Sequence, residues 1–211
     1  MKKFISSIIL SLCLLAAASF AQNANETVPA AVSYGIVVDN SGSYRTLLGS
    51  VIDFSKDIVE ENKTDDEAFV VRFVASDNIK LAQNFTDSKT ELRDTLDNLY
   101  IEGGLTALLD AVYFSAKYLA ENSKDEAGRK KFLILITDGE DRKSAVKIEE
   151  LLKFLKEKQI KVYAVALADE KVSQRVLDKL TKETGGKKYL PKTRAELPAI
   201  AKELANQIRI Q

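Results

Sequence analysis

Five oxygen-bearing side chains stand where apolar segments of the chain stop or where a glycine pair interrupts it: Asp39, Ser41, Ser43, Thr106 and Asp138. Hard cations such as Mg²⁺, Mn²⁺ and Ca²⁺ prefer oxygen ligands of this kind. Of these ions, Mg²⁺ takes an octahedral shell and usually keeps waters or an external ligand in part of it. If the five side chains meet in space, they form a site for one divalent cation, Mg²⁺ in the first place, with Mn²⁺ or Ca²⁺ as alternatives.

The composition leaves little other chemistry for such a site. The chain has no histidine, and its single cysteine, Cys13, lies in an N-terminal segment that we expect to be removed. The remaining sequence therefore provides no disulfide framework, no thiolate nucleophile, no Ser-His-Asp triad and no imidazole or thiolate metal ligand. Carboxylate and hydroxyl oxygens remain as the candidate metal ligands.

Residues 1–21 have the pattern of an export signal. A basic start precedes a mostly apolar stretch over residues 4–18, and Ser19-Phe20-Ala21 offers small residues at the two positions that a signal peptidase reads. We expect cleavage after Ala21 and a periplasmic or secreted protein. A membrane anchor is the alternative, but the apolar stretch is short for a span.

Removal of this segment changes the charge balance little. The whole chain has 31 basic and 31 acidic residues, and the loss of Lys2 and Lys3 leaves 29 basic ones, a net charge of −2. This near-neutral balance argues against nucleic acid or an anionic membrane surface as the main partner. Residues 22–31 form a flexible polar leader in this interpretation, and residues 32–211 form one domain.

Two apolar runs predict strands that are buried on both faces. Residues 32–38 and residues 131–137 each contain successive apolar side chains without polar alternation. Each run ends in a carboxylate, Asp39 or Asp138. Ligands of open α/β sheets bind outside the carboxyl ends of the strands, so the two carboxylates should flank one crevice if the chain reverses direction between their strands.

The rest of the chain alternates between helical and strand patterns. Apolar periodicity predicts helices over residues 43–61, 88–99, 106–121, 144–158 and 172–182, a last helix opened by Thr193 or Pro198, and strands over residues 67–74, 79–82, 160–167 and 187–190. The turn at residues 76–78 is so tight that the strand after it should return antiparallel. The pattern predicts an α/β fold, with a doubly wound, mostly parallel sheet of about six strands, one short antiparallel edge strand and helices on both faces.

Each candidate ligand also has a purely structural interpretation. Ser43 and Thr106 are possible helix caps. Ser41-Gly42 is a possible turn, and Asp138-Gly139 is a possible strand-ending turn. Any one of these features alone is weak evidence for a metal, whereas all five at strand ends favour one.

Four neighbouring residues are candidates for a rim that contacts a partner: Tyr44, Gly104, Glu140 and Asp141. Tyr44 could instead cover the first helix. Solvated loop charges are the alternative for Glu140 and Asp141, and Gly104 could belong to a simple turn.

The ordered set of motifs resembles a von Willebrand factor type A domain with a metal-ion-dependent adhesion site. The family's Asp-x-Ser-x-Ser signature stands here as Asp39-Asn40-Ser41-Gly42-Ser43, its loop threonine as Gly103-Gly104-Leu105-Thr106, and its second aspartate as Thr137-Asp138-Gly139. The resemblance extends from Val32 to the end of the chain and is greatest to small exported bacterial members. It implies the Rossmann-like fold of that family.

The resemblance also implies a ligand set. Ser41, Ser43 and Thr106 would hold the cation, Asp39 and Asp138 would act directly or through water, and a protein partner would supply an Asp or Glu carboxylate to the sixth position. Neutral hydroxyls donate little charge, so the chemistry of the residues agrees that the cation would accept an outside anion.

Three functions fit this pattern. The leading one is an exported, cation-dependent protein-binding module without enzyme activity. The second is a Mg²⁺-dependent phosphoryl-transfer hydrolase, although haloacid-dehalogenase-type phosphatases want a second aspartate where Ser41 stands. The third is a scaffold with the same fold that binds partners away from the metal site.

Overall fold

The computed structural model describes residues 30–168 and 172–210. The expected signal segment and most of the leader lie outside the described residues. At the end of the leader, the Ala31 carbonyl accepts a hydrogen bond from Lys130 N at 3.0 Å, so sheet pairing extends to Ala31. Within the described residues, no helix has the length and apolar character that crossing a lipid bilayer requires.

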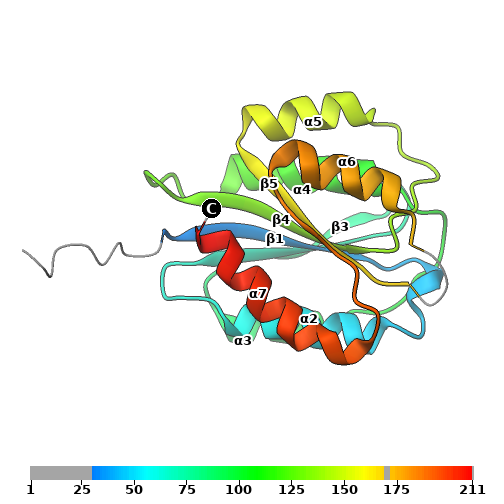
Figure 1. The fold of residues 1–211 in the computed structure, drawn as a ribbon, viewed down its shortest axis with the longest axis horizontal. Coiled ribbons are helices and arrows are strands. Elements are labelled where there is room, and N and C mark those ends of the chain that lie inside the picture. Colours follow the sequence, from blue (N-terminus) through cyan, green and yellow to red (C-terminus); the bar gives the residue numbers. More distant parts are fainter. Residues whose placement is uncertain (1–29, 169–171, 211) are drawn as a thin grey trace, which may run out of the picture.

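A six-stranded sheet in the order β3-β2-β1-β4-β5-β6 forms the centre of the domain (Figure 1). Its strands are β1 (Val32–Asp39), β2 (Glu67–Phe73), β3 (Ile79–Thr86), β4 (Lys130–Thr137), β5 (Ile160–Ala166) and β6 (Lys188–Tyr189). All neighbours pair in parallel except β2 and β3. The prediction of a mostly parallel sheet with one antiparallel edge strand is therefore confirmed. The edge strand is longer than expected, and its half-exposed, alternating pattern explains why only its first residues were recognised.

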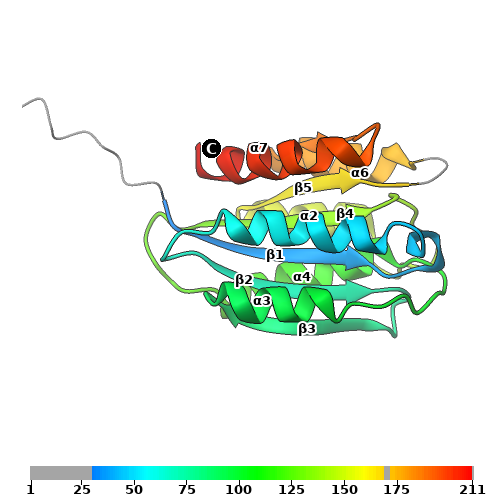
Figure 2. The same ribbon diagram turned by 90° about the horizontal axis from the view of Figure 1, so that it is seen from below.

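Helices cover both faces of the sheet, as predicted (Figure 1). One face carries α4 (Leu108–Asn122), α5 (Ile148–Glu157) and α6 (Gln174–Thr184), and the other carries α2 (Leu48–Glu60), α3 (Lys89–Asp97) and α7 (Leu197–Ile210). Figure 2 shows α3, α2 and α7 lying side by side across the second face. The described residues also contain two 3₁₀ turns, η2 (Gly42–Tyr44) and η3 (Arg194–Glu196).

Strand β1 divides the two hydrophobic cores. All eight of its residues are buried. Ile36 and Val38 pack into the core under α2 and α7, whereas Val37 packs into the core under α4 and α6. Burial on both faces of the sheet thus explains why the sequence of β1 is continuously apolar.

The chain reverses direction around β1, which places the switch point of the sheet beside it. After β1 the chain continues to β2 on one side, and it later returns to β4 on the other side. Val38 pairs with Ile136, so Asp39 lies beside Thr137 and one residue from Asp138. Both carboxylates therefore reach the crevice in which open α/β sheets bind ligands.

Four helices, α2, α4, α5 and α6, begin later than predicted, and for α2 and α4 the difference concerns the candidate ligands. The first helix begins at Leu48, because Tyr44 N donates to the Ser41 carbonyl at 3.0 Å and closes the short turn η2 first. The helix after the glycine pair begins at Leu108. Consequently neither Ser43 nor Thr106 is a helix cap, and the structural interpretation of these two hydroxyls does not hold.

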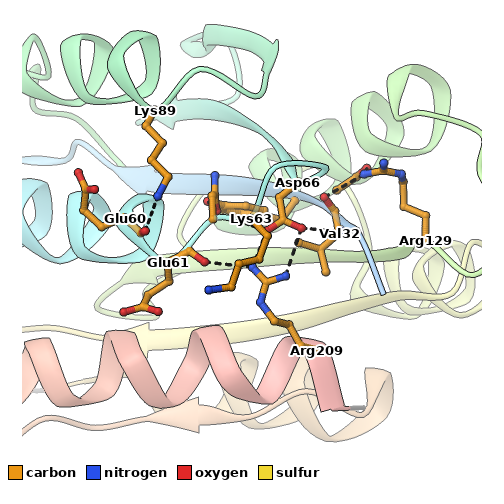
Figure 3. A network of polar contacts seen from close by, with 11 residues as sticks. Val32, Glu60, Glu61, Lys63, Asp66, Lys89, Arg129 and Arg209 are labelled. Carbon is orange, nitrogen blue, oxygen red and sulfur yellow. Dashed lines mark hydrogen bonds and ion pairs between the residues drawn. The ribbon is translucent and has the colours of Figure 1, made fainter. Parts of the chain in front are cut away.

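At the end of the sheet opposite to the crevice, a buried ion pair joins β1, α7 and the loop before β2. Figure 3 shows Asp66 at the centre of this network. Its carboxylate accepts hydrogen bonds from Val32 N at 3.1 Å, from Lys63 N at 2.6 Å and from both Arg209 nitrogens at 3.2 and 2.5 Å. The Asp66 side chain is 1% exposed and that of Arg209 11%, so this network holds α7 against the sheet in a largely desolvated contact.

Candidate metal centre

Asp39 is a fixed and fully buried carboxylate at the end of β1. Its Oδ1 accepts a hydrogen bond from Ser41 N at 2.9 Å, and its Oδ2 accepts one from Thr137 Oγ1 at 2.8 Å. Burial raises the pKa of Asp39 to about 6; the hydrogen bonds from Ser41 and Thr137 oppose this rise, and the Asp138 carboxylate adds to it. Both oxygens are thus engaged, which suits an anion that acts on a cation through water more than one that binds it directly.

The two serine hydroxyls lie next to each other and next to the second aspartate. Ser41 Oγ is 3.0 Å from Ser43 Oγ, and Ser43 Oγ donates to Asp138 Oδ2 at 2.9 Å. Asp138 Oδ1 accepts a hydrogen bond from Glu140 N at 2.9 Å, which fixes its orientation. Two strand ends that are about a hundred residues apart in sequence therefore meet through Ser43.

Thr106 reaches the same place from the loop between α3 and α4. Its backbone is held by Arg142 N and Lys143 N, which donate to its carbonyl at 2.8 and 3.2 Å. Thr106 lines a cavity of about 200 Å³ together with Ser41, Ser43 and Gly104. All three hydroxyl residues of the predicted set therefore border one cavity.

Glycines shape both loops at this cavity. Gly104 has φ +128°, and a Cβ there would lie 2.6 Å from Val74 Cγ1. Gly139 has φ +82°, and a Cβ there would lie 2.1 Å from the Ser173 carbonyl. These conformations and close approaches exclude larger residues, so the glycines are required to bring Thr106 and Asp138 into position.

The spacing of the oxygens fits a small divalent cation. Adjacent ligands of an octahedral Mg²⁺ ion with bonds of about 2.0–2.1 Å lie about 2.9 Å apart. The separations of 3.0 Å between the serine oxygens and 2.9 Å between Ser43 and Asp138 match that edge. In the described part of the chain no group of three or more His, Cys, Asp or Glu residues could hold a metal, so a cation here would depend on the hydroxyls.

The four rim candidates have different environments. Tyr44 is fully buried, and its hydroxyl donates to the Leu167 carbonyl at 2.8 Å, so it packs in the core beneath the groove that it helps to line. Asp141 Oδ1 accepts from Leu108 N at 2.9 Å and thereby caps α4. Glu140 and Gly104 do line the cavity.

A polar cluster anchors the loop that carries Thr106. Glu102 forms an ion pair with Arg72 and accepts a hydrogen bond from Asn78, and these contacts lower the pKa of Glu102 to about 2, the Asn78 bond most strongly. Glu102 N also donates to the Asn40 carbonyl at 3.2 Å. The loop is thus tied to the end of β1 and to the edge of β2.

Sequence reasoning missed three kinds of supporting residue. Thr137 orients Asp39, and its only signal was a hydroxyl at the end of a buried apolar run. Glu102 acts through partners that only the fold brings near it. Arg45 and Arg142 line a larger groove of about 510 Å³ beside the cavity, and nothing in their spacing indicated this.

Comparisons with known proteins agree with this architecture. The sequence profile of the von Willebrand factor type A domain matches residues 35–203. No curated protein matches the chain in sequence.

Several solved structures are similar in fold. An aerotolerance-related membrane protein from Bacteroides fragilis has a TM-score of 0.67 at 15% identity, with 83% of this chain and 99% of that chain covered. A von Willebrand factor type A protein from Catenulispora acidiphila has a TM-score of 0.69 at 18% identity, with 85% and 42% covered. The corresponding domain of a type V pili tip protein from Porphyromonas gingivalis has a TM-score of 0.69 at 12% identity, with 87% and 97% covered. At such identities the likeness concerns the fold, and together with the profile match over most of the chain it establishes the family: the chain belongs to the von Willebrand factor type A domain family.

Proposed function

We propose that this protein is an exported, non-catalytic binding module that takes up one divalent cation and uses it to bind a carboxylate of a protein partner. The observation that carries the proposal is the contact of Ser43 Oγ with Ser41 Oγ at 3.0 Å and with Asp138 Oδ2 at 2.9 Å. It joins hydroxyl and carboxylate oxygens from two strand ends at the spacing of an octahedral shell. Mg²⁺ is the expected ion, and Mn²⁺ or Ca²⁺ are alternatives.

The charges around the site support an anionic partner. Three carboxylates, of Asp39, Asp138 and Glu140, lie in or beside the cavity and its adjoining groove, together with the guanidinium groups of Arg45 and Arg142. Their formal charge is −1, and a bound divalent cation makes it +1. The site would then repel a carboxylate without the cation and attract one with it.

The environment of Asp39 supports a binding role over phosphoryl transfer. A nucleophilic aspartate needs an oxygen that a substrate can reach. Asp39 is fully buried, and both of its oxygens accept hydrogen bonds within the chain. At the second position after it, where an acid/base aspartate would stand, Ser41 bonds to Ser43 instead.

Export is proposed from the N-terminal sequence, and a surface role is consistent with the similar structures. One of them is the domain of a type V pili tip protein of Porphyromonas gingivalis. The partner would then lie in the periplasm or outside the cell.

We expect a captured partner to bind in Mg²⁺ and to be released by a chelator. Replacing the partner's contacting carboxylate with its amide should weaken binding at least about thirtyfold, as for a hot spot of about 2 kcal/mol, because the contact to the cation is charge-assisted and partly desolvated. Thr106→Ala should weaken binding similarly without unfolding the chain, whereas Thr64→Ala, at an exposed position outside the site, should not. Surface plasmon resonance measures the partner's affinity in Mg²⁺ and in chelator, and the effect of each of these substitutions on it. Equal binding in chelator would favour the scaffold function.

The affinity for Mg²⁺ should fall as the pH is lowered through about 6. A proton on Asp39 competes with the cation, so the affinity for Mg²⁺ should drop by about tenfold per pH unit below that value.

The stability of the metal-free protein should change with pH in the opposite direction. Because the folded chain holds this proton more tightly than the unfolded chain, the contribution of Asp39 to stability falls as the pH rises from 3.8 through about 6. Calorimetric titration and chemical unfolding across this range test both, and a flat Mg²⁺ affinity would contradict the role given to Asp39.

A further inference from the structure

We propose that the groove beside the metal centre binds a second acidic residue of the partner, and that Arg45 is the residue that recognises it. This inference rests on the proposed function and specifies its partner as a segment with two carboxylates, one for the cation and one for Arg45.

The groove continues directly from the cavity that the hydroxyls border. Both are lined by Gly42, Ser43, Glu140 and Arg142, and the groove then extends past Arg45 to Leu167 and Ala168. Its volume of about 510 Å³ is more than twice that of the cavity at about 200 Å³. A chain segment that places one side chain at the metal therefore has room to continue along the groove.

The backbone that carries Arg45 is firmly placed. Arg45 follows the 3₁₀ turn, and its N–H donates to the Gly42 carbonyl at 3.4 Å in an αR conformation. The preceding residue, Tyr44, is fully buried and hydrogen-bonded to Leu167. The side chain of Arg45 thus projects from a rigid turn that also carries the cation-binding Ser43.

The two arginines of the groove differ in their partners. Arg142 pairs with Glu140 at 2.5 Å, with both side chains about half exposed. Arg45 is exposed and forms no ion pair with any residue of the described part of the chain. Its guanidinium is therefore available to a ligand.

The chemistry of arginine selects the ligand. A guanidinium offers planar paired donors that match both oxygens of a carboxylate. With a divalent cation bound, the described charged residues of the site and groove have a formal charge of +1, which favours the binding of a second anion. Because Arg45 is exposed, the gain is modest, about two- to fivefold in affinity.

The test uses the purified protein, saturating Mg²⁺ and short blocked peptides that contain one aspartate, or that aspartate plus a glutamate at varied offsets on either side. Peptide affinities are measured by NMR titration and Mn²⁺ affinity by calorimetry. At least one two-acid peptide should bind about two- to fivefold more tightly than the one-acid peptide. Arg45→Gln should remove this preference, so that the two-acid and one-acid peptides bind this variant equally well, while the variant still binds Mn²⁺. The matched variant Arg93→Gln changes an exposed arginine of α3 outside the groove and should keep the preference.

The possible results distinguish a failure of the role given to Arg45 from a failure of the proposed function. If the one-acid peptide binds in Mg²⁺ but no second acid improves it, or if Arg45→Gln retains the preference, the role of Arg45 is refuted while the proposed function stands. If Mg²⁺ binds but no acidic peptide does, the proposed function fails and this inference fails with it.

Discussion

Mg²⁺ should raise the free energy of unfolding of this protein by about 2.7 kcal/mol when its free concentration is a hundred times its dissociation constant. Only the folded chain brings Ser41, Ser43 and Thr106 to one cavity with Asp138 beside them, so the ion binds the native state and not the unfolded one. Chemical unfolding with Mg²⁺ and with chelator measures the difference. Mn²⁺ or Ca²⁺ should give a gain of the same kind if either is the preferred ion.

Asp138→Asn should remove this stabilisation, because it takes a charged oxygen from the set. Asp125→Asn makes the same chemical change at an exposed loop position outside the site and should leave the gain intact. A Mg²⁺ effect that survives in Asp138→Asn would show that the ion acts elsewhere on the protein.

Asp66→Ala should lower the free energy of unfolding by about 3–5 kcal/mol, the cost of removing one partner of a buried ion pair. The change leaves the Arg209 guanidinium, 11% exposed, without its carboxylate and deprives Val32 N and Lys63 N of their acceptor. Both the start of β1 and the end of α7 lose their attachment. Urea unfolding followed by circular dichroism measures the loss.

The neighbouring Asp65→Ala provides a matched control, since Asp65 lies in the same loop but is exposed. Its effect should stay within about 0.5 kcal/mol, as for ordinary surface positions. Similar losses in the two variants would mean that the loop's sequence, and not the ion pair at Asp66, stabilises this end of the domain.

The sheet was predictable because strands that are buried on both faces have continuous apolar sequences. Strands β1 and β4 are continuous apolar runs, and the three-residue turn before Ile79 forced an antiparallel return. Strand β3 has one exposed face and a mixed polar and apolar sequence, so its predicted end at residue 82 is four residues before its end in the structure.

The positions of the candidate ligands were predictable, but their surroundings were not. Strand ends and glycines indicated where the hydroxyls and carboxylates converge. The burial of Tyr44, the cap that Asp141 gives to α4, and the anchoring of Glu102 by Arg72 all depend on contacts between distant segments. Local patterns carry no information about such contacts.

The number of Mn²⁺ ions bound per chain, counted by electron paramagnetic resonance, tests the central claim most directly. We expect one ion for the wild-type protein and a markedly weakened site in Thr106→Ala and Asp39→Asn, with circular dichroism spectra unchanged for Thr106→Ala. No bound ion at about 10 mM Mn²⁺, well above the range of weak extracellular cation sites, would contradict it. So would one ion bound with the same affinity in both variants.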